Sequence, residues 1–386
     1  MTAPRLPDPT PIRAFLDARH LTLAGAATDF AVRELAPLPE PADDNAARTQ
    51  SRELMAKIGA AGLFAPIAAM DWRGCCLVRE ALAAASPLAD AVFALQGLST
   101  VPILLSGHEA FKEQWVKPAI AGQAMGAFAM TEPEAGSDVA AMKTTSRHQG
   151  ENYVLHGTKT FISNAGIADF YTVFATGDAA QGTTGISCFV VPGNAIGLKF
   201  VRAQILSAPH PLGEIVLDRC LIPASHRLGD EGRGLGLGLK TLDRLRATVG
   251  AAACGMAARA LHEALAHARA RQQFGKPLAD FQLVQEKLSR MATDLTAARL
   301  LVYRAAAAAD AGAERVTLEA AQAKLFATEA AQRIVDDAVQ ILGGRGVLAD
   351  HPVDRLYRSV RALRIYEGTT EIQHLVIARQ LLEAAS

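Results

Sequence analysis

The chain has 386 residues, of which half are hydrophobic and a fifth are charged, and this length predicts two or three globular domains. Lysine plus arginine equals aspartate plus glutamate at 39 each, which argues against a basic surface for nucleic acid or a polybasic membrane anchor. No charge-free apolar stretch reaches the roughly 18 residues that a membrane span needs, and prolines interrupt the N-terminus where a secretion signal needs an apolar segment. We therefore expect a cytoplasmic protein that binds neither nucleic acid nor a membrane.

The cysteines and histidines show no pattern of a disulfide framework or a metal site. CxxC spacing is absent, and the histidines lack HxxxH spacing. Adjacent Cys75 and Cys76 are expected to be packing residues rather than a redox pair. We expect no bound metal and a reducing compartment.

The predicted elements change character twice along the chain. From about Ile12 to Ile120 the pattern is helical and rich in alanine. Helices here should begin or end at three prolines, Pro87, Pro102 and Pro118. From Met125 to about Leu228, short β-branched and aromatic runs separated by Gly, Asn, Asp and Pro predict a compact antiparallel β domain.

After Gly229 the pattern becomes helical again. From Phe281, apolar residues recur at steps of three and four, which predicts a long helix in a bundle. A second helix is expected from about Val316 to Leu342, where the sequence GGRG ends it. The order of helices, strands and helices indicates an α+β multidomain protein, with domains at 1–122, 123–229 and 230–386, rather than a βαβ alternation.

The glycine-rich stretch GDEGRGLGLGLK (Gly229–Lys240) has two interpretations. A Rossmann fingerprint would need a parallel βαβ unit and an acidic residue about 20 positions later at a second strand. The sequence after Lys240 is continuous helix instead. We therefore favour a flexible segment that leads into that helix.

Four segments carry patterns that suit a functional site. They are AFAMTEPEAGSD (127–138) followed by HGTKTFISNAG, then RQQFGKP (271–277), QILGGRG (340–346) and IYEGTTEIQ (365–373). A Gly-Ser-Asp turn after a strand exposes backbone N–H groups and a hydroxyl, which suits a phosphate. In this combination and order, the segments identify the chain as similar to the acyl-CoA dehydrogenase family over essentially its whole length.

The resemblance implies an architecture and a reaction. The fold would be an N-terminal helical domain, a middle β domain and a C-terminal four-helix-bundle domain, usually in a homotetramer. FAD would lie between the β domain and the C-terminal helices, with part of its site supplied by a neighbouring subunit. The reaction would be α,β-dehydrogenation of an acyl-CoA thioester, with the hydride going to flavin N5 and the electrons to an electron-transfer flavoprotein.

The resemblance also assigns residues. In the β domain it places Phe128, Met130 and Thr131 against the flavin, the Gly136–Ser137 turn at the phosphates, and Phe161, Ile162 and Ser163 near flavin N5. In the C-terminal helices it implies FAD contacts, some of them with a partner's FAD, from Arg271, Phe274, Gln282, Gln340, Gly343, Gly344, Thr369 and Glu371. For the substrate it implies Ser137, Gly368 and the pair Asp243 and Arg246, which would lie near the pantetheine and CoA.

Glu367 matches the usual catalytic base of the family. Some relatives carry the base one residue before the arginine of the Asp–Arg pair, but Leu245 stands there in this chain and cannot accept a proton. The thioester carbonyl would be polarised by the backbone N–H of Glu367 and a ribityl hydroxyl of FAD. Gly368 would allow the backbone to approach the ligand closely.

Several positions depart from the family pattern, and they bear on the substrate class. The loop at 204–214 is about two residues short, Val347 stands where a tyrosine is frequent, and Ser359 where an aspartate is common. Three alternatives to a dehydrogenase are a flavin-dependent lyase, which would usually lack the base, an oxidase that uses oxygen, and a silent binding scaffold.

Overall fold

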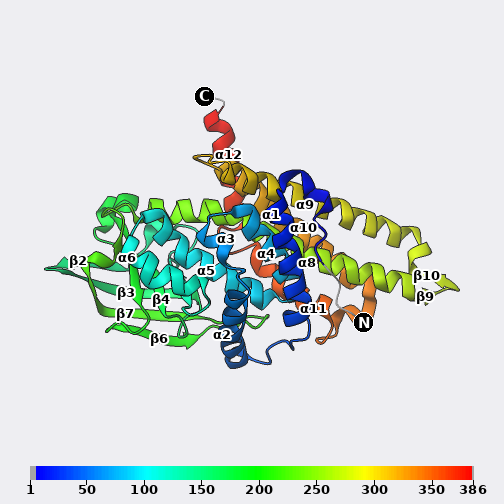
Figure 1. The fold of residues 1–386 in the computed structure, drawn as a ribbon, viewed down its shortest axis with the longest axis horizontal. Coiled ribbons are helices and arrows are strands. Elements are labelled where there is room, and N and C mark those ends of the chain that lie inside the picture. The colour runs from blue at the N-terminus through cyan, green and yellow to red at the C-terminus, as the bar shows by residue number, and fades with distance from the viewer. Residues whose placement is uncertain (1–5, 385–386) are drawn as a thin grey trace. The chain divides into compact units, whose positions relative to one another are not determined.

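The computed structural model describes residues 6–384, in which helices, strands and helices follow one another along the chain (Figure 1). The chain divides into two compact units. The helical unit comprises the residues up to Pro39, Asp71–Asp90, and the residues from Asp243 onwards. The sheet unit comprises Glu40–Met70 and Ala91–Leu242.

The helical unit is built from N-terminal and C-terminal segments. Its N-terminal helices are η1 (Thr10–Phe15), α1 (Ala18–Phe30), η2 (Ala31–Leu35) and α4 (Trp72–Ala85). Its C-terminal elements are most of α8 (Gly234–Ala270), β9 (Gln272–Gln273), β10 (Lys276–Pro277), η7 (Leu278–Asp280), α9 (Gln282–Asp310), α10 (Thr317–Leu342), η8 (Gly343–Val347), α11 (Pro352–Leu363) and α12 (Thr370–Ala384).

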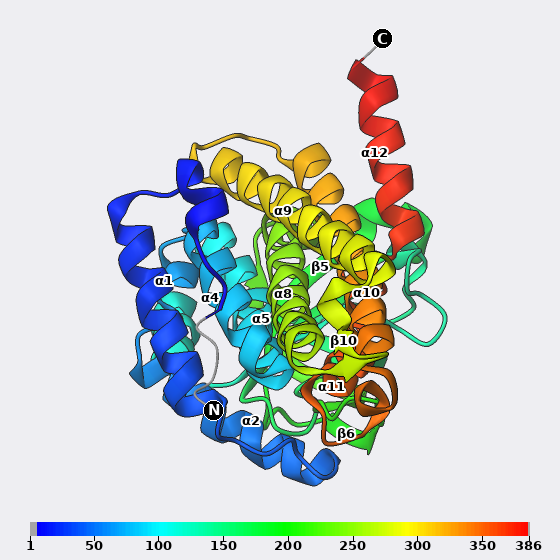
Figure 2. The same cartoon turned by 90° about the vertical axis from the view of Figure 1, so that its right-hand side faces the viewer.

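Helix α10 is the centre of this C-terminal group, since it contacts α9, α11 and α12. Half of its buried positions are alanines, and these small side chains let neighbouring helices approach closely. Figure 2 shows α9 alongside α10 and α12 extending away from them. The two helices expected from Phe281 and from Val316 to Leu342 are confirmed as α9 and α10. Cys75 and Cys76 are confirmed as buried packing residues of α4.

The sheet unit combines helices with one sheet. The helices are α2 (Asp44–Ala60), α3 (Ala65–Ala68), most of α5 (Pro87–Ser106), α6 (Glu109–Phe111), η3 (Lys112–Val116), α7 (Lys117–Ile120), η4 (Val139–Ala141), η5 (Ala179–Gly185) and η6 (Ala224–His226). The strands are β1 (Gly126–Ala129), β2 (Thr145–Gln149), β3 (Asn152–Ser163), β4 (Phe170–Thr176), β5 (Ile186–Pro192), β6 (Leu198–Ala203), β7 (Leu212–Pro223) and β8 (Arg227–Leu228).

The strand order is β6-β7-β3-β2-β4-β5-β8, and β1 pairs with β4. Most pairings are antiparallel as expected, but β1 and β2 both pair with β4 in parallel. Strand β4 is buried along its whole length, because Tyr171 and Val173 face one core cluster while Phe170 and Phe174 face another that includes residues of α5–α7. The sheet curls, since Tyr153 of β3 contacts the Phe189 ring of β5 at 5.0 Å across the two intervening strands.

Helix α5 corrects one expectation and bears on another. The prediction that Pro102 ends a helix is wrong: α5 continues through it, and the carbonyl of Ser99 in that turn accepts a hydrogen bond from Thr172 Oγ1 at 2.9 Å. Helix α5 is also long and apolar enough to span a membrane by length and composition, although Asp90 lies within it, so it is not a charge-free stretch of the expected kind. However, 78% of its apolar window is buried in the protein, as in a core helix.

The glycine-rich stretch is mostly helix rather than a flexible segment. Helix α8 begins at Gly234, and the glycines permit close packing. A Cβ on Gly234 would lie 2.3 Å from the backbone nitrogen of Cys188, and one on Gly238 would lie 2.6 Å from Met130 Cε. From α8 to residue 384 the elements are helices apart from the two-residue strands β9 and β10, so the rejection of a Rossmann fingerprint is confirmed.

Candidate active site

Glu367 lies in the loop between α11 and α12 of the helical unit, in a strained backbone conformation. Its φ is 55°, in the left-handed region, and Gly368 follows with a φ of 97°. A non-glycine residue in this region costs about 1–3 kcal/mol and persists only where its surroundings hold it. Here the Glu367 carbonyl accepts from Arg246 Nε at 3.2 Å and Gln373 Nε2 at 3.3 Å. The Gly368 carbonyl accepts from Lys324 Nζ at 2.7 Å and from Gln373 at 3.1 Å.

Two polar groups of Glu367, a carboxylate oxygen and the backbone N–H, are left without hydrogen-bond partners among the described residues. Oxygen Oε2 of Glu367 is shielded from solvent and has no hydrogen-bond partner within the described part of the chain. The Glu367 backbone N–H has no acceptor among residues 6–384. A Cβ on Gly368 would lie 2.4 Å from Gln373 Nε2, so glycine is required here by space as well as by φ.

Burial raises the pKa of Glu367, whereas Arg79, Arg246 and Lys324 lower it without cancelling the effect of burial. Burial also lowers the pKa of Lys324 to about 8, although the charge of Glu367 opposes this shift. A carboxyl whose pKa is moved toward neutrality is suited to exchange a proton with a weak carbon acid.

Arg79, one of the cations that lower the pKa of Glu367, is held in place by hydrogen bonds to buried partners. Its guanidinium donates to both carboxylate oxygens of Asp90 at 2.7 and 2.9 Å and to Thr248 Oγ1 at 2.9 Å. The Arg79 side chain is almost fully buried, where an unpaired charge would be costly.

The predicted substrate pair lies beside the Glu367 loop. Arg246 Nη1 donates to Asp243 Oδ1 at 2.5 Å, and Thr317 Oγ1 donates to Asp243 Oδ2 at 2.7 Å. Since Arg246 also donates to the Glu367 carbonyl, the structure brings the predicted base, Gly368 and both members of the pair together. Leu245 is buried.

In the sheet unit, the structure brings two predicted flavin segments side by side. The Thr160 N–H donates to the Thr131 carbonyl at 3.0 Å, and Lys159 Nζ donates to the Met130 carbonyl at 3.1 Å. Lys159 also pairs with Glu132 Oε1 at 2.8 Å, and both side chains are buried. Of the predicted residues, Phe128, Thr131 and Ser163 are half-buried, Met130 and Ile162 are buried, and Phe161 is 61% exposed.

The Gly136–Ser137 turn is open to solvent. Glu132 and Ala135 exchange backbone hydrogen bonds of 3.0 and 3.2 Å, and this tight turn sets the direction of the two residues that follow. The backbone N–H groups of Gly136 and Ser137 have no acceptor in the described part of the chain. A Cβ on Gly136 would meet nothing within 4 Å.

The remaining predicted residues lie on exposed segments of the helical unit. After α8, strands β9 and β10 form a hairpin. The two central residues of its turn, Phe274 and Gly275, have φ of 51° and 79°, as a type I′ turn requires. Phe274 is 92% exposed at this tip. The other exposed or half-buried positions are Arg271, Gln282, Gln340, Gly343, Gly344, Thr369 and Glu371. Arg271 and Arg345 both lie close enough to His267 to lower its pKa together with burial, so the end of α8 adjoins the end of the QILGGRG segment.

Sequence patterns did not identify Lys324, Arg79 or Asp90. The sequence could have indicated Arg79 and Asp90 as buried charges, because both lie in a largely apolar stretch. A charged side chain that is buried needs a partner. Lys324 gave no comparable signal, since a lysine in an alanine-rich helix is ordinarily exposed.

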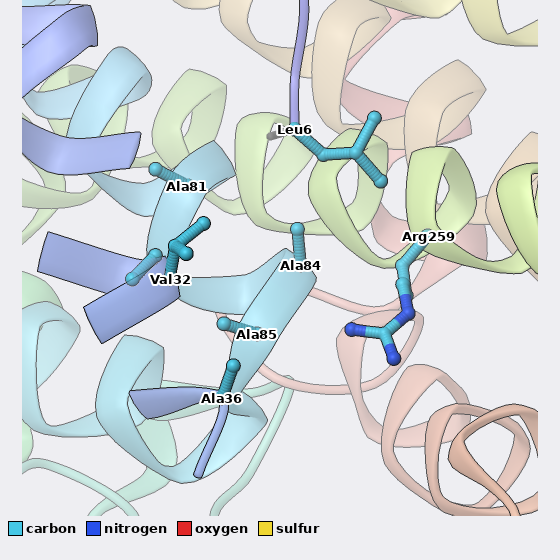
Figure 3. A pocket seen from close by; sticks show the side chains of 8 residues that line it. Leu6, Val32, Ala36, Ala81, Ala84, Ala85 and Arg259 are labelled. Atoms are coloured by element: carbon cyan, nitrogen blue, oxygen red, sulfur yellow. The ribbon is translucent and has the colours of Figure 1, made fainter. Parts of the chain in front are cut away.

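Two other features of the helical unit do not form a site. A cavity lined by Leu6, Val32, Ala84, Arg259 and further alanines has room for no more than about one water molecule (Figure 3). The ligand atoms of His20, Asp71 and Asp310 lie within 4.8 Å of one another. However, Asp310 caps the start of α4 by accepting from the Trp72 N–H at 2.7 Å.

The comparisons agree on one family. The chain matches the family models "Acyl-CoA dehydrogenase, N-terminal domain" over residues 17–123, "middle domain" over 127–220 and "C-terminal domain" over 232–382. It is 40% identical to the "3-(aryl)acrylate reductase" of Clostridium sporogenes, over 96% of this chain and 100% of the relative. It is 37% identical to the "Caffeyl-CoA reductase-Etf complex subunit CarC" of Acetobacterium woodii, over 92% of this chain and 96% of the relative.

A solved structure supports the same conclusion. The butyryl-CoA dehydrogenase of Megasphaera elsdenii matches with a TM-score of 0.89 at 32% identity, over 95% of this chain and 99% of that one. The expected order of an N-terminal helical, a middle β and a C-terminal helical domain is confirmed. The chain therefore belongs to the acyl-CoA dehydrogenase family, the FAD-dependent oxidoreductases that act on the CH–CH group of acyl-CoA thioesters.

Proposed function

We propose that the protein dehydrogenates an acyl-CoA thioester to the trans-2-enoyl-CoA, with Glu367 as the base. The observation that carries this proposal is the unpaired, solvent-shielded Oε2 oxygen of Glu367 in a loop whose two carbonyls are held by three side chains. The α-proton would pass to this carboxylate. FAD, when bound, supplies the acceptor for the hydride that leaves the β-carbon.

The surrounding residues would assist at defined atoms. Arg79, Arg246 and Lys324 limit the rise in the pKa of Glu367, which favours the ionised form that acts as a base. The free N–H of Glu367 would donate to the thioester carbonyl and stabilise the charge that develops there. Asp243 and Arg246 would contact the pantetheine and CoA beside the base.

The residues proposed to hold FAD suit that group. The exposed Phe161 offers an aromatic face, Ser163 a hydroxyl, and the Gly136–Ser137 turn two unpaired N–H groups for phosphate oxygens. The full proposed set is Phe128, Met130, Thr131, Gly136, Ser137, Phe161, Ile162, Ser163, Arg271, Phe274, Gln282, Gln340, Gly343, Gly344, Thr369 and Glu371.

We also infer a homotetramer and an electron-transfer flavoprotein as acceptor. Several large apolar side chains of the helical unit are strongly exposed, namely Phe274, Leu283, Leu375 and Leu382 at 92%, 80%, 66% and 73%. Surfaces of this kind favour burial against another subunit. The name of the Acetobacterium relative, which includes an Etf complex, supports the choice of acceptor.

The reverse reaction, reduction of a 2-enoyl thioester, is a second candidate. It is favoured by the names of two relatives, both called reductases. A Glu367 with a raised pKa could return the proton to the α-carbon by the same path in reverse.

The test of the proposed function is anaerobic bleaching of the flavin by a panel of acyl-CoA thioesters, with Glu367→Gln as the matched variant. The amide keeps the size of the side chain but cannot accept a proton, so bleaching should slow by about 10²–10⁴-fold while FAD stays bound. Bleaching at nearly the wild-type rate would refute the assignment of the base. Re-oxidation of the reduced enzyme by enoyl-CoA measures the reverse direction, and oxygen uptake during turnover would identify an oxidase.

A further inference from the structure

The loop between β6 and β7, which is shorter than the family pattern, is bonded to the end of β3 by its side chains. Gln204 accepts from the Phe161 backbone N–H at 2.8 Å and donates to Thr160 Oγ1 at 2.9 Å. The pairing of β3 with β7 shifts register between Lys159 and Ile162, so the Phe161 backbone lacks a regular strand partner there. Gln204 supplies the missing acceptor and holds Phe161 at its φ of 54°.

His210, at the other end of this loop, contacts Ser163. Its Nε2 lies 2.7 Å from Ser163 Oγ, whereas its Nδ1 is buried and has no partner in the described chain. Burial lowers the pKa of His210 to about 4; Arg48 adds to this effect and Asp44 opposes it. The imidazole is therefore neutral under ordinary conditions and carries one N–H.

The backbone on both sides of this contact is fixed. Arg48 donates to the carbonyls of Ala165 and Leu212, which follow Ser163 and His210 in the chain. The Asn164 N–H donates to the Pro211 carbonyl at 2.9 Å. Ser163 and His210 are thus held opposite each other by main-chain contacts that do not depend on their own hydrogen bond.

The unpaired Nδ1 indicates which nitrogen carries the proton. A proton on Nδ1 would leave a buried donor unpaired, which proteins avoid more strictly than an unpaired acceptor. With the proton on Nε2, the imidazole donates to Ser163 Oγ. The hydroxyl hydrogen of Ser163 is then free to donate to another group.

We propose that His210 and Gln204 are positioning residues for the flavin-facing end of β3. His210 orients the Ser163 hydroxyl by donating to its oxygen, and Gln204 fixes the backbone that presents the Phe161 ring. This inference deepens the proposed function and rests on it, because Ser163 and Phe161 are assigned to FAD there. The loop is therefore part of the cofactor's surroundings rather than a simple connection between strands.

The experiment compares the FAD-loaded variants His210→Leu, His210→Gln, Ser163→Ala and the double variant His210→Leu/Ser163→Ala. The measurements are the flavin absorbance spectrum, the flavin midpoint potential and the rate of anaerobic bleaching. His210→Leu should shift the spectrum and potential as Ser163→Ala does and slow bleaching by about two- to tenfold, the effect of one neutral hydrogen bond. The double variant should be no worse than either single variant. His210→Gln, whose amide can still donate, should recover most of the wild-type values.

Three results would overturn this inference. They are an unchanged spectrum and potential in His210→Leu, additive effects in the double variant, or a His210→Gln variant that is as impaired as His210→Leu. Each of these results can be obtained from the flavin spectrum and midpoint potential, which require neither Glu367 nor a particular thioester. If instead no thioester bleaches the wild type, the proposed function fails while the spectra and potentials still decide the roles of His210 and Ser163. Thermal unfolding of each variant establishes that it is folded.

Discussion

Replacing Lys324 with methionine removes one of the three cations that lower the pKa of Glu367 and leaves the other two in place. An opposite charge close to a carboxyl lowers its pKa by about 1–3 units. Because Lys324 acts less strongly than Arg79 and Arg246, we expect the pKa of Glu367 to rise by about one unit, the lower end of that range. The variant also loses the 2.7 Å hydrogen bond from Nζ to the Gly368 carbonyl.

The assay is the rate of anaerobic flavin bleaching as a function of pH. A base must be ionised to act, so the acidic limb of the profile should move to higher pH by about one unit. At pH values on the acidic side of that limb, the flavin of Lys324→Met should bleach about tenfold more slowly than that of the wild type. The two profiles should approach each other above pH 8, because burial lowers the pKa of Lys324 to about 8 and the wild type loses the charge there as well.

Two controls isolate the charge. Lys324→Arg keeps a cation and should leave the acidic limb near its wild-type position. Lys287→Met removes a cation that pairs with Asp337 at 2.8 Å, elsewhere in the same unit, and should not move the limb. An acidic limb that stays in place or moves to lower pH in Lys324→Met would refute this account of the site's electrostatics.

Three further outcomes are expected. Arg271→Ala should weaken FAD binding by about 1.5–3 kcal/mol per lost charge-assisted contact, and a monomer with full FAD occupancy in ultracentrifugation would contradict the shared site. Gly234→Ala should lower the free energy of unfolding by about 1–3 kcal/mol, because its Cβ would meet the backbone of Ser187 at 2.3 Å, whereas Gly236→Ala, with no atom within 4 Å, should be neutral or stabilising. The folded pKa of His210, about 4, lies below the unfolded value, so this group lowers stability as pH falls from about 6.5 to 4. In denaturant titrations over this pH range, the free energy of unfolding should fall less in His210→Gln than in the wild type, by up to about 3 kcal/mol.

The sequence predicted features that depend on local pattern. The apolar steps from Phe281 define α9 because they extend over many turns of one helix face. The GGRG segment ends α10 because Gly343 adopts a φ of 59°. The match of IYEGTTEIQ to a family motif predicts Glu367 and Gly368 as site residues, and the structure places Asp243 and Arg246 beside them.

Features that depend on contacts between distant residues could not be predicted. Arg79 bonds to Thr248, 169 positions away, and no periodicity encodes that distance. Pro102 stays within α5 although its local signal is a helix end, so tertiary packing overrides the local preference. The glycines of α8 suggested flexibility in the sequence, whereas Gly234 and Gly238 are required by close neighbours from β5, β4 and Met130.

The left-handed backbone at Glu367 has a consequence for the evolution and engineering of this protein. Glycine is the residue that best tolerates such a φ, and it would relieve the backbone without disturbing the carbonyls held by Arg246, Lys324 and Gln373. It would also remove the only carboxyl in the loop that has an unpaired, shielded oxygen among the described residues. Position 367 therefore illustrates a stability–activity trade-off, in which selection for thermostability alone would favour loss of the proposed base.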